Sequence, residues 1–398
     1  MANNNKHTGP NVPALRFPEF SGEWIESKLG DIADFSKGTG ISKDQRSEEG
    51  NPCILYGELY TRYKSEVITN VFSKTALPDS ELVKSKANDI IIPASGETAE
   101  DIATARCVPF DNILLGGDLN IIRLHEQDGK FFSYQLNGVR KYDIATVAQG
   151  VSVVHLHAGD LKGITVKYPS HIAEQEKISQ ILGLIDDRIA TQSKIIEELT
   201  TLRSALLEKV FQVSNPTLEV GAIAHQTSER NKLCRYSNVL SVSNRFGFIN
   251  QSEQFEGRNV ASDDVRNYKV VHRGDFAYNP ARINVGSIAM LKSFESGIVS
   301  PMYICFQVDD TIVDPSFFEL FLETKAFKDE MEIRLEGSVR RCLSFEALCE
   351  IHLPLPALLV QRSISNKIGN ISAKIKLEDR ILRAYIRQKE WLLKQMFI

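Results

Sequence analysis

Long hydrophobic runs are missing from this 398-residue sequence. A membrane-spanning helix needs roughly 20 consecutive apolar residues, whereas the stretch Ile90–Ile92 already ends at Pro93. We therefore expect no transmembrane segment and no membrane partner. The residues from Met1 to His7 are polar, so we also expect no secretory signal peptide and a cytoplasmic location.

Closely paired cysteines and a strong charge of either sign are also missing. None of the six cysteines belongs to a Cys-x-x-Cys pair, which argues against zinc ribbons and zinc fingers and favours reduced, buried thiols. The 47 Lys and Arg residues against 51 Asp and Glu residues give a net charge of -4. Any DNA-binding face must therefore be a local patch, or partner proteins must help to supply it.

The usual motifs of nucleotide-driven and catalytic proteins are absent as well. There is no Walker A pattern, and Gly38-Thr39-Gly40 lacks the third glycine of a dinucleotide-binding loop because Lys43 occupies that position. The segment Tyr278-Asn279-Pro280-Ala281 lacks the second proline and the aromatic residue of adenine methyltransferase motifs. His155 and His157 alternate as on a strand face, which favours a hydrogen-bonded pair over a metal site. The sequence therefore indicates a binding protein, with no metal and no cofactor of its own.

The chain contains an internal repeat. The segments Ile164–Pro169 and Ile351–Pro356 are short and apolar, end in proline and lie 187 residues apart (351 − 164). A long helical pattern follows each of them, over Ile172–Phe211 and over Leu358–Phe397. Further matches upstream join Asp89 to Asp275, Gly150 to Gly337, Leu156 to Leu343, Leu161 to Leu348 and Leu29–Ala33 to Val220–Ala224.

Both helical patterns predict a coiled coil. Apolar residues recur at alternating spacings of three and four, with polar breaks at Gln192 and Glu378 and with Leu206 and Val210 in the seam of the first helix. About forty residues at 1.5 Å each make a rod of roughly 60 Å. We expect the two helices to pack antiparallel within the chain. The alternatives are that they form the core of one compact fold or that each pairs with another chain.

The predicted fold class is α+β. It comprises two mixed α/β domains, separated by two long antiparallel helices that form a coiled coil, with a pseudo-twofold internal repeat. We expect mostly strands and loops in the mixed regions, which are rich in β-branched and aromatic residues with frequent Gly, Asn and Asp. The expected boundaries are an extended N-terminal arm at 1–20, a first domain at 21–170, a helix at 171–213, a second domain at 214–356 and a helix at 357–398.

Six loops carry residue types that read base edges or hold phosphates in protein–DNA complexes. Two domains on a rigid spacer also suit a duplex with two separated sites. For any single residue, the alternative is an ordinary solvated surface side chain. The candidate DNA-binding residues are Lys37, Ser42, Lys43, Arg62, Tyr63, Lys64, Ser95 and Glu97 in the first domain, and Asn244, Arg245, Asn279, Arg282, Arg340 and Arg341 in the second.

Several local stretches, taken with the repeated helices, are typical of one protein family. They are Pro-Ala-Leu-Arg-Phe-Pro-Glu-Phe-Ser-Gly-Glu-Trp at 13–24, Leu-Gly-Asp at 29–31, Ala-Gln-Gly-Val-Ser-Val-Val-His-Leu at 148–156 and Gly-Ser-Val-Arg-Arg-Cys-Leu at 337–343. Together they resemble the specificity (S) subunit of type I restriction–modification enzymes, and the resemblance covers nearly the whole chain.

The resemblance implies a noncatalytic DNA-recognition subunit. Each mixed domain would be a target recognition domain for one half of a bipartite sequence, and the helices would dock methyltransferase (M) subunits. S-adenosylmethionine, ATP and Mg²⁺ would be bound by the M and restriction (R) subunits. Recognition domains vary widely in this family, so the resemblance does not identify the base-contacting residues. The alternatives are a catalytic DNA enzyme, a nuclease or methyltransferase with fused recognition domains, and a protein–protein scaffold built on the coiled coil.

Overall fold

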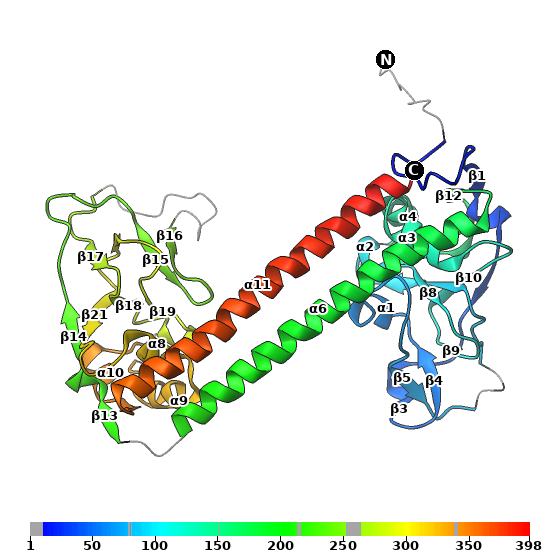
Figure 1. Cartoon of the computed structure of the whole chain (residues 1–398). Helices are drawn as coiled ribbons and strands as arrows, with labels where there is room; N and C mark the ends of the chain where they lie inside the picture. Colours follow the sequence, from blue (N-terminus) through cyan, green and yellow to red (C-terminus); the bar gives the residue numbers. More distant parts are fainter. Residues whose placement is uncertain are drawn as a thin grey trace. The chain divides into compact units, whose positions relative to one another are not determined.

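Two long helices each contribute to both of the units into which the structure divides (Figure 1). The computed structural model describes residues 11–78, 80, 82–150, 152–212, 216–251, 264–337 and 341–398. Unit 1 consists of Met1–Lys194 with Asp379–Ile398, and unit 2 of Ile195–Glu378. The long helices are α6 (Ile172–Gln212) and α11 (Leu358–Met396), so both predicted helices are confirmed. In the described part of the chain, no helix combines the length and apolar character that crossing a bilayer requires.

The mixed domain of unit 1 is built on an antiparallel sheet, in the order β2-β10-β6-β8, that is covered on both faces. Ile90 and Ile92 of β6 lie in a hydrophobic cluster with α3, whereas Ile91 lies in a cluster with β4 and β9 of a second, smaller sheet. Because side chains alternate across a strand, a strand that is covered on both faces reads as a continuous apolar run.

The elements of unit 1 besides the long helices are short. The strands are β1 (Ile25–Lys28), β2 (Ala33–Lys37), β3 (Arg46–Ser47), β4 (Asn51–Ile54), β5 (Ser73–Thr75), β6 (Asp89–Pro93), β7 (Ser95–Gly96), β8 (Arg106–Val108), β9 (Leu114–Leu115), β10 (Leu119–Leu124), β11 (Val154–His155) and β12 (Thr165–Tyr168). The helices are α1 (Glu58–Thr61), α2 (Ala99–Ile102), α3 (Gly129–Asn137), α4 (Lys141–Val147) and α5 (Ala158–Lys162), with 3-10 turns η1 (Leu29–Asp31) and η2 (Lys43–Gln45).

The mixed domain of unit 2 repeats the same sheet, in the order β14-β21-β18-β19. Its strands are β13 (Thr217–Glu219), β14 (Ala224–Thr227), β15 (Leu240–Ser243), β16 (Gly247–Asn250), β17 (Lys269–His272), β18 (Phe276–Tyr278), β19 (Ile288–Met290), β20 (Ser296–Val299), β21 (Ile304–Val308) and β22 (His352–Pro354). Its helices are α8 (Pro315–Glu323), α9 (Lys325–Ile333) and α10 (Phe345–Cys349), with 3-10 turns η4 (Val220–Ala222) and η5 (Ile283–Val285).

The repeat is visible in individual hydrogen bonds. The side chain of Asp89 caps the turn before β6 by accepting from the backbone N–H of Lys86 at 2.8 Å. Asp275 does the same before β18, where it accepts from the backbone N–H of His272 at 2.8 Å. Both aspartates are buried. They make the same hydrogen bond at equivalent positions of the two domains, in agreement with the sequence match between them.

The two long helices run antiparallel within unit 1. Asp186 of α6 forms an ion pair with Lys389 of α11 at 2.6 Å. Two residues further along α6, the guanidinium of Arg188 lies 5.9 Å from the centre of the Tyr385 ring. Residue numbers therefore rise along α6 as they fall along α11, which confirms the predicted direction of packing.

The same direction holds in unit 2, with one correction to the predicted seam. Arg203 Nε of α6 donates to Ser372 Oγ of α11 at 2.7 Å, and Leu207 shares a hydrophobic cluster with Ile368. Leu207 is 4% exposed and the expected seam residue Leu206 is 36% exposed, so the prediction was wrong at this turn. A straight α-helix drifts by about 20° per heptad against a 3.5-residue repeat, which moves the buried stripe to the next position.

The mixed domains hold more helix than their composition indicates. α3 and α8 are helices of nine residues, and their aromatic residues lie in the core. The expectation of mostly strands and loops did not locate these two helices. Each helix follows an aspartate, Asp128 or Asp314, whose side chain accepts hydrogen bonds from the first turn. Such N-caps were a usable signal in the sequence.

Candidate nucleic-acid interface

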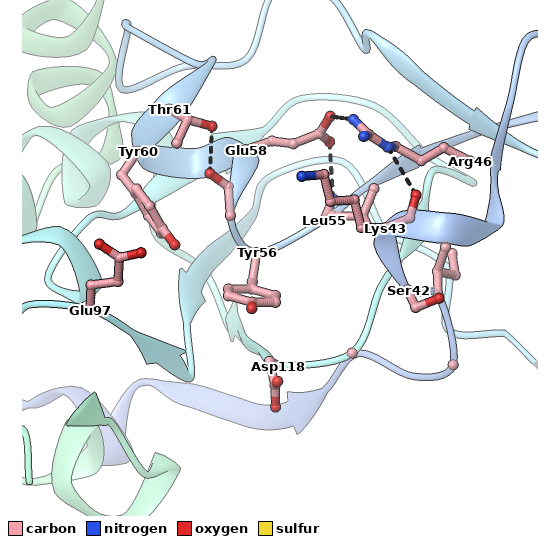
Figure 2. A pocket seen from close by; sticks show the side chains of 14 residues that line it. Ser42, Lys43, Arg46, Leu55, Tyr56, Glu58, Tyr60, Thr61, Glu97 and Asp118 are labelled. Atoms are coloured by element: carbon pink, nitrogen blue, oxygen red, sulfur yellow. Dashed lines mark hydrogen bonds and ion pairs between the residues drawn. The ribbon is translucent and has the colours of Figure 1, made fainter. Parts of the chain in front are cut away.

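A cavity in the mixed domain of unit 1 brings together the three loops that the sequence predicts there. It has a volume of about 620 Å³ and is open on one side. Figure 2 shows Tyr60 and Glu97 on one side of it, Ser42 and Lys43 on the other, and Tyr56 between them. The loop at 37–43 contributes Gly40, Ile41, Ser42 and Lys43, the loop at 60–64 contributes Tyr60 and Thr61, and the loop at 95–98 contributes Glu97.

Backbone contacts fix one wall of the cavity. The N–H of Gly38 donates to the carbonyl of Leu119 at 3.0 Å, and the N–H of Thr39 donates to the carbonyl of Leu115 at 3.1 Å. A Cβ at Gly38 would lie 2.0 Å from the carbonyl oxygen of Gly116, so only glycine permits this approach of the two chain segments. The wall is therefore held by backbone geometry rather than by the side chains that line the cavity.

The buried carboxylate of Glu58 anchors positive charge beside the cavity. It accepts hydrogen bonds from the backbone N–H of Leu55 at 3.2 Å and from the hydroxyl of Ser73. Arg62 Nη1 lies 3.5 Å and Arg46 Nη1 lies 4.0 Å from Glu58 Oε1. Because one carboxylate faces two guanidinium groups, this end of the cavity keeps a net positive charge.

The opposite side of the cavity carries acceptors and a neutral hydroxyl. Burial raises the pKa of Tyr60, and the neighbouring Tyr56, Asp101 and Glu97 raise it further. Tyr60 therefore keeps its proton at neutral pH and remains a hydrogen-bond donor. Within the described residues, the carboxylates of Glu97 and Asp118 have no hydrogen-bond or ion-pair partner.

The structure places the eight candidate residues of the first domain in different surroundings. Ser42, Lys43 and Glu97 line the cavity, and Lys37 is exposed at the end of β2. Arg62 faces Glu58 and stacks on Phe72, 4.5 Å from the ring centre, and Lys64 donates to the carbonyl of Thr61 at 3.2 Å. Tyr63 and Ser95 are buried, and burial, followed by the charge of Glu58, raises the pKa of Tyr63 to about 12. Their burial argues against direct contact with DNA.

Most of the residues that line the cavity were not among the candidates, including Arg46, Tyr56, Tyr60 and Asp118. Tyr60 belongs to the predicted loop at 60–64 but was not a candidate residue, and Tyr56 lies outside the predicted loops. Arg46 lies three positions after Lys43, at the end of η2, and Asp118 follows the glycine pair Gly116-Gly117. The glycines next to Asp118 indicate a loop in the sequence. Only the fold, however, brings this loop close to Arg46, Tyr56 and Tyr60.

The predicted loops of the second domain also lie together, as far as they are described. The turn between β15 and β16 holds Asn244 and Arg245, and a Cβ at Gly286 would lie 3.5 Å from the Cβ of Asn244. The N–H of Leu343 donates to the carbonyl of Pro280 at 3.2 Å, which joins the chain after β18 to the segment that follows residue 341. These loops therefore form one neighbourhood at the end of β18.

The six candidates of the second domain differ in their availability. Asn244, Arg245 and Arg282 are exposed, and Asn279 is half-buried, with Oδ1 accepting from the backbone N–H of Ala281 at 3.1 Å. Arg341 Nη2 donates to the carbonyl of Glu332 at 3.0 Å and pairs with the Glu332 carboxylate. Arg340 lies outside the described residues.

Comparison with known proteins shows similarity to one family. Residues 21–201 match the family model described as "Type I restriction modification DNA specificity domain". Over 401 aligned positions the chain is 23% identical to the type I restriction enzyme MjaVIII specificity subunit of Methanocaldococcus jannaschii, covering 92% of this chain and 89% of that protein. The chain is therefore similar to specificity subunits of type I restriction–modification systems, as the sequence predicts. This similarity supports a DNA sequence-recognition subunit.

Solved structures share the fold of this chain. The type I S subunit from M. genitalium matches with a TM-score of 0.65 and 18% identity, over 97% of this chain and 99% of that one. A chain from a study of complex assembly and conformational transition of the type I system matches with a TM-score of 0.52 and 13% identity, over 94% and 97% of the two chains. At such low identity these matches support the fold alone. The residues that contact DNA must be argued from the structure of this chain.

Proposed function

We propose that this chain is an S subunit that reads a bipartite DNA sequence, with one mixed domain for each half-site. One observation carries the proposal: the two domains present different side chains on the same backbone framework. The N–H of Leu156 donates to the carbonyl of Ala94 at 2.9 Å, and the N–H of Leu343 donates to the carbonyl of Pro280 at 3.2 Å. These matching bonds fasten the loops that follow β6 and β18. Two domains that share a backbone framework but differ in their loop side chains are suited to reading two different half-sites.

The side chains on the two frames favour different base edges. In the first domain, Glu97 is an acceptor for an amino group, such as N4 of cytosine. In the second domain, Arg282 and Arg245 are donors suited to guanine, and Asn244 is suited to adenine. Lys37 and Lys43 are exposed and suited to phosphates. The two domains would therefore prefer different sequences.

The long helices are proposed to dock M subunits, which would bind S-adenosylmethionine and methylate adenine. α6 and α11 leave large apolar side chains exposed, among them Leu184 at 57%, Leu377 at 50% and Trp391 at 54%. Exposed apolar side chains of this size favour contact with a protein partner. R subunits, with ATP and Mg²⁺, would complete a cytoplasmic complex. The partners would also add phosphate contacts that a chain with a net charge of -4 lacks.

Methylation mapping tests the proposal directly. The chain is expressed with its M subunit in cells that lack other adenine methylation, and modified adenines are located across the genome. We expect one motif with two specified halves and an unspecified gap of fixed length. A single continuous motif, or methylation that does not depend on this chain, would contradict the proposal. Turnover by the purified chain alone, on DNA with Mg²⁺ or S-adenosylmethionine, would instead support the catalytic alternative.

A further inference from the structure

The cavity of unit 1 is too large and too concave to serve only as a reader of base edges. Base edges are read in the grooves by side chains that protrude from a protein surface. A ligand of this cavity must instead extend one of its own groups into it. A volume of about 620 Å³ falls in the range of small-ligand pockets, roughly 300–1,000 Å³, and is ample for one nucleotide.

The chemistry of the walls fits a planar ring that carries an amino group. The rings of Tyr56 and Tyr60 offer faces for stacking, as aromatic side chains do for unstacked bases. The carboxylates of Glu97 and Asp118 accept hydrogen bonds, and neither has a partner within the described residues. Two acceptors select a ligand with an exocyclic amino group and disfavour a bare anion.

The other side of the cavity fits the rest of a nucleotide. Lys43 and Ser42 lie there, beside Arg46, and together they offer a cation and a hydroxyl suited to a phosphate. Arg46 is held in place because its Nε donates to the carbonyl of Lys43 at 3.2 Å and its Nη1 faces Glu58. The acidic side and the basic side are thus separated, as the amino-bearing base and the phosphate of a nucleotide are.

We propose that this cavity receives a single unstacked nucleobase with an exocyclic amino group, adenine, cytosine or guanine, with Glu97 and Asp118 as acceptors and the two tyrosines as stacking faces. The proposal rests on the proposed function, because the base would come from the half-site that the first domain reads. A base leaves the duplex at a cost of a few kcal/mol, and that cost is lower where its pair is already broken. A free nucleoside has the same chemistry and is the other possible source.

Single-position mismatches in the mapped half-site of the first domain test the proposal. The complex of the full-length chain with its M subunits is titrated with duplexes that carry one mismatch each, and Kd is measured by fluorescence anisotropy at fixed salt. The methylated adenine is left out, because its extrusion would serve the M active site. We expect one other position, occupied by adenine, cytosine or guanine, at which breaking the pair tightens binding by about tenfold. Removal of that base should weaken binding by a similar factor.

Two matched variants connect that position to the cavity. Glu97→Gln keeps the shape of the side chain but replaces the carboxylate by an amide with a single acceptor oxygen, and it should reduce the preference for an amino-bearing base at that position. Glu100→Gln removes an exposed carboxylate three residues away that does not line the cavity, and it should behave as the wild type does. The half-site of the second domain should respond to neither substitution.

The possible outcomes distinguish a failure of the cavity proposal from a failure of the proposed bipartite recognition. If specific binding persists and no such position exists, the cavity proposal is overturned and bipartite recognition stands. If neither half-site is bound specifically, both fail. Adenosine, cytidine, guanosine and thymidine are also titrated onto the full chain without DNA. Binding of one of the three amino-bearing nucleosides that Glu97→Gln weakens, with no mismatch effect in DNA, would assign the cavity to a free nucleoside.

Discussion

Arg16 and Glu174 form a two-point ion pair, with Nε 2.8 Å from Oε1 and Nη2 2.8 Å from Oε2. The side chain of Glu174, in the first turn of α6, is 0% exposed, and that of Arg16 is 13% exposed. Trp24 Nε1 donates to the same Oε1 at 3.3 Å, and the N–H of Leu15 donates to the carbonyl of Gln395 in α11 at 2.9 Å. The segment that precedes β1 therefore ties the start of α6 to the end of α11 within unit 1.

Glu174→Gln should destabilise unit 1 by about 3 kcal/mol, because it leaves a largely buried guanidinium without its counter-charge. Urea unfolding followed by circular dichroism would show a lower midpoint for the first transition. Glu176→Gln is the matched control, since Glu176 is exposed on the same turn. Equal midpoints for the two variants would show that the pair contributes little to stability.

Substituting alanine for Asp128 or for Asp314 should destabilise the respective unit by a similar amount. Asp128 Oδ2 accepts from Ser179 Oγ at 2.6 Å, and Asp314 Oδ1 accepts from Ser365 Oγ at 2.7 Å. Each aspartate also caps the short helix that follows it, so each substitution should cost about 2 kcal/mol. Hydrogen exchange read by mass spectrometry should show faster exchange in α3 for Asp128→Ala and in α8 for Asp314→Ala. Faster exchange in the opposite unit would contradict this equivalence.

The long helices and the repeat could be predicted because both depend on patterns that are local in sequence. A heptad over forty residues, or a match such as that of Asp89 with Asp275, needs no knowledge of the fold. The cavity could not be predicted in this way, since Arg46, Tyr56 and Asp118 come from separate segments that meet only when two sheets pack together. The sequence did select three loops that reach the cavity, but it could not separate Glu97, which lines it, from the buried Ser95.

Stability should fall above pH 9 through the buried thiols. Burial raises the pKa of Cys107 and of Cys305 to about 12 from an ordinary value of 9.0. Between these values the unfolded chain loses the thiol proton and the folded chain keeps it, so unfolding becomes more favourable by roughly 1.4 kcal/mol per pH unit for each thiol. Cys305→Ala should therefore reduce the slope of stability against pH between 9 and about 11. Cys234 is exposed, and Cys234→Ala should leave the slope unchanged.

Arg282→Ala should relax specificity in one half-site only. Arg282 is exposed beside Asn279, whose carbonyl accepts from the Arg282 N–H at 3.0 Å, and it stands on the loop that follows β18. If its guanidinium reads a guanine, the wrong base at one position should be discriminated less well by about tenfold, and the other half-site should be untouched. Methylation mapping of the variant reports both half-sites at once.

A second arginine separates base reading from phosphate binding. Arg273 precedes β18 at the opposite end of the strand, where it pairs with Glu295 at 2.6 Å. Arg273→Ala should change neither half-site. If Arg282→Ala instead weakens binding equally on all sequences and lowers the salt dependence, Arg282 contacts a phosphate and does not read a base.

Matched four-residue insertions near Thr200 of α6 and near Ser372 of α11 should widen the gap between the half-sites and leave the half-sites themselves unchanged. Thr200 is exposed on α6, and one added helical turn lengthens that helix by about 6 Å. At 3.4 Å per base pair, the unspecified spacer should grow by roughly two base pairs at most. Because α6 and α11 pair antiparallel, a matching insertion near Ser372 should be needed for the full effect, and an insertion in α6 alone should mainly lower stability. Methylation mapping measures the gap directly. An altered half-site with an unchanged gap would mean that the helices do not set the spacing.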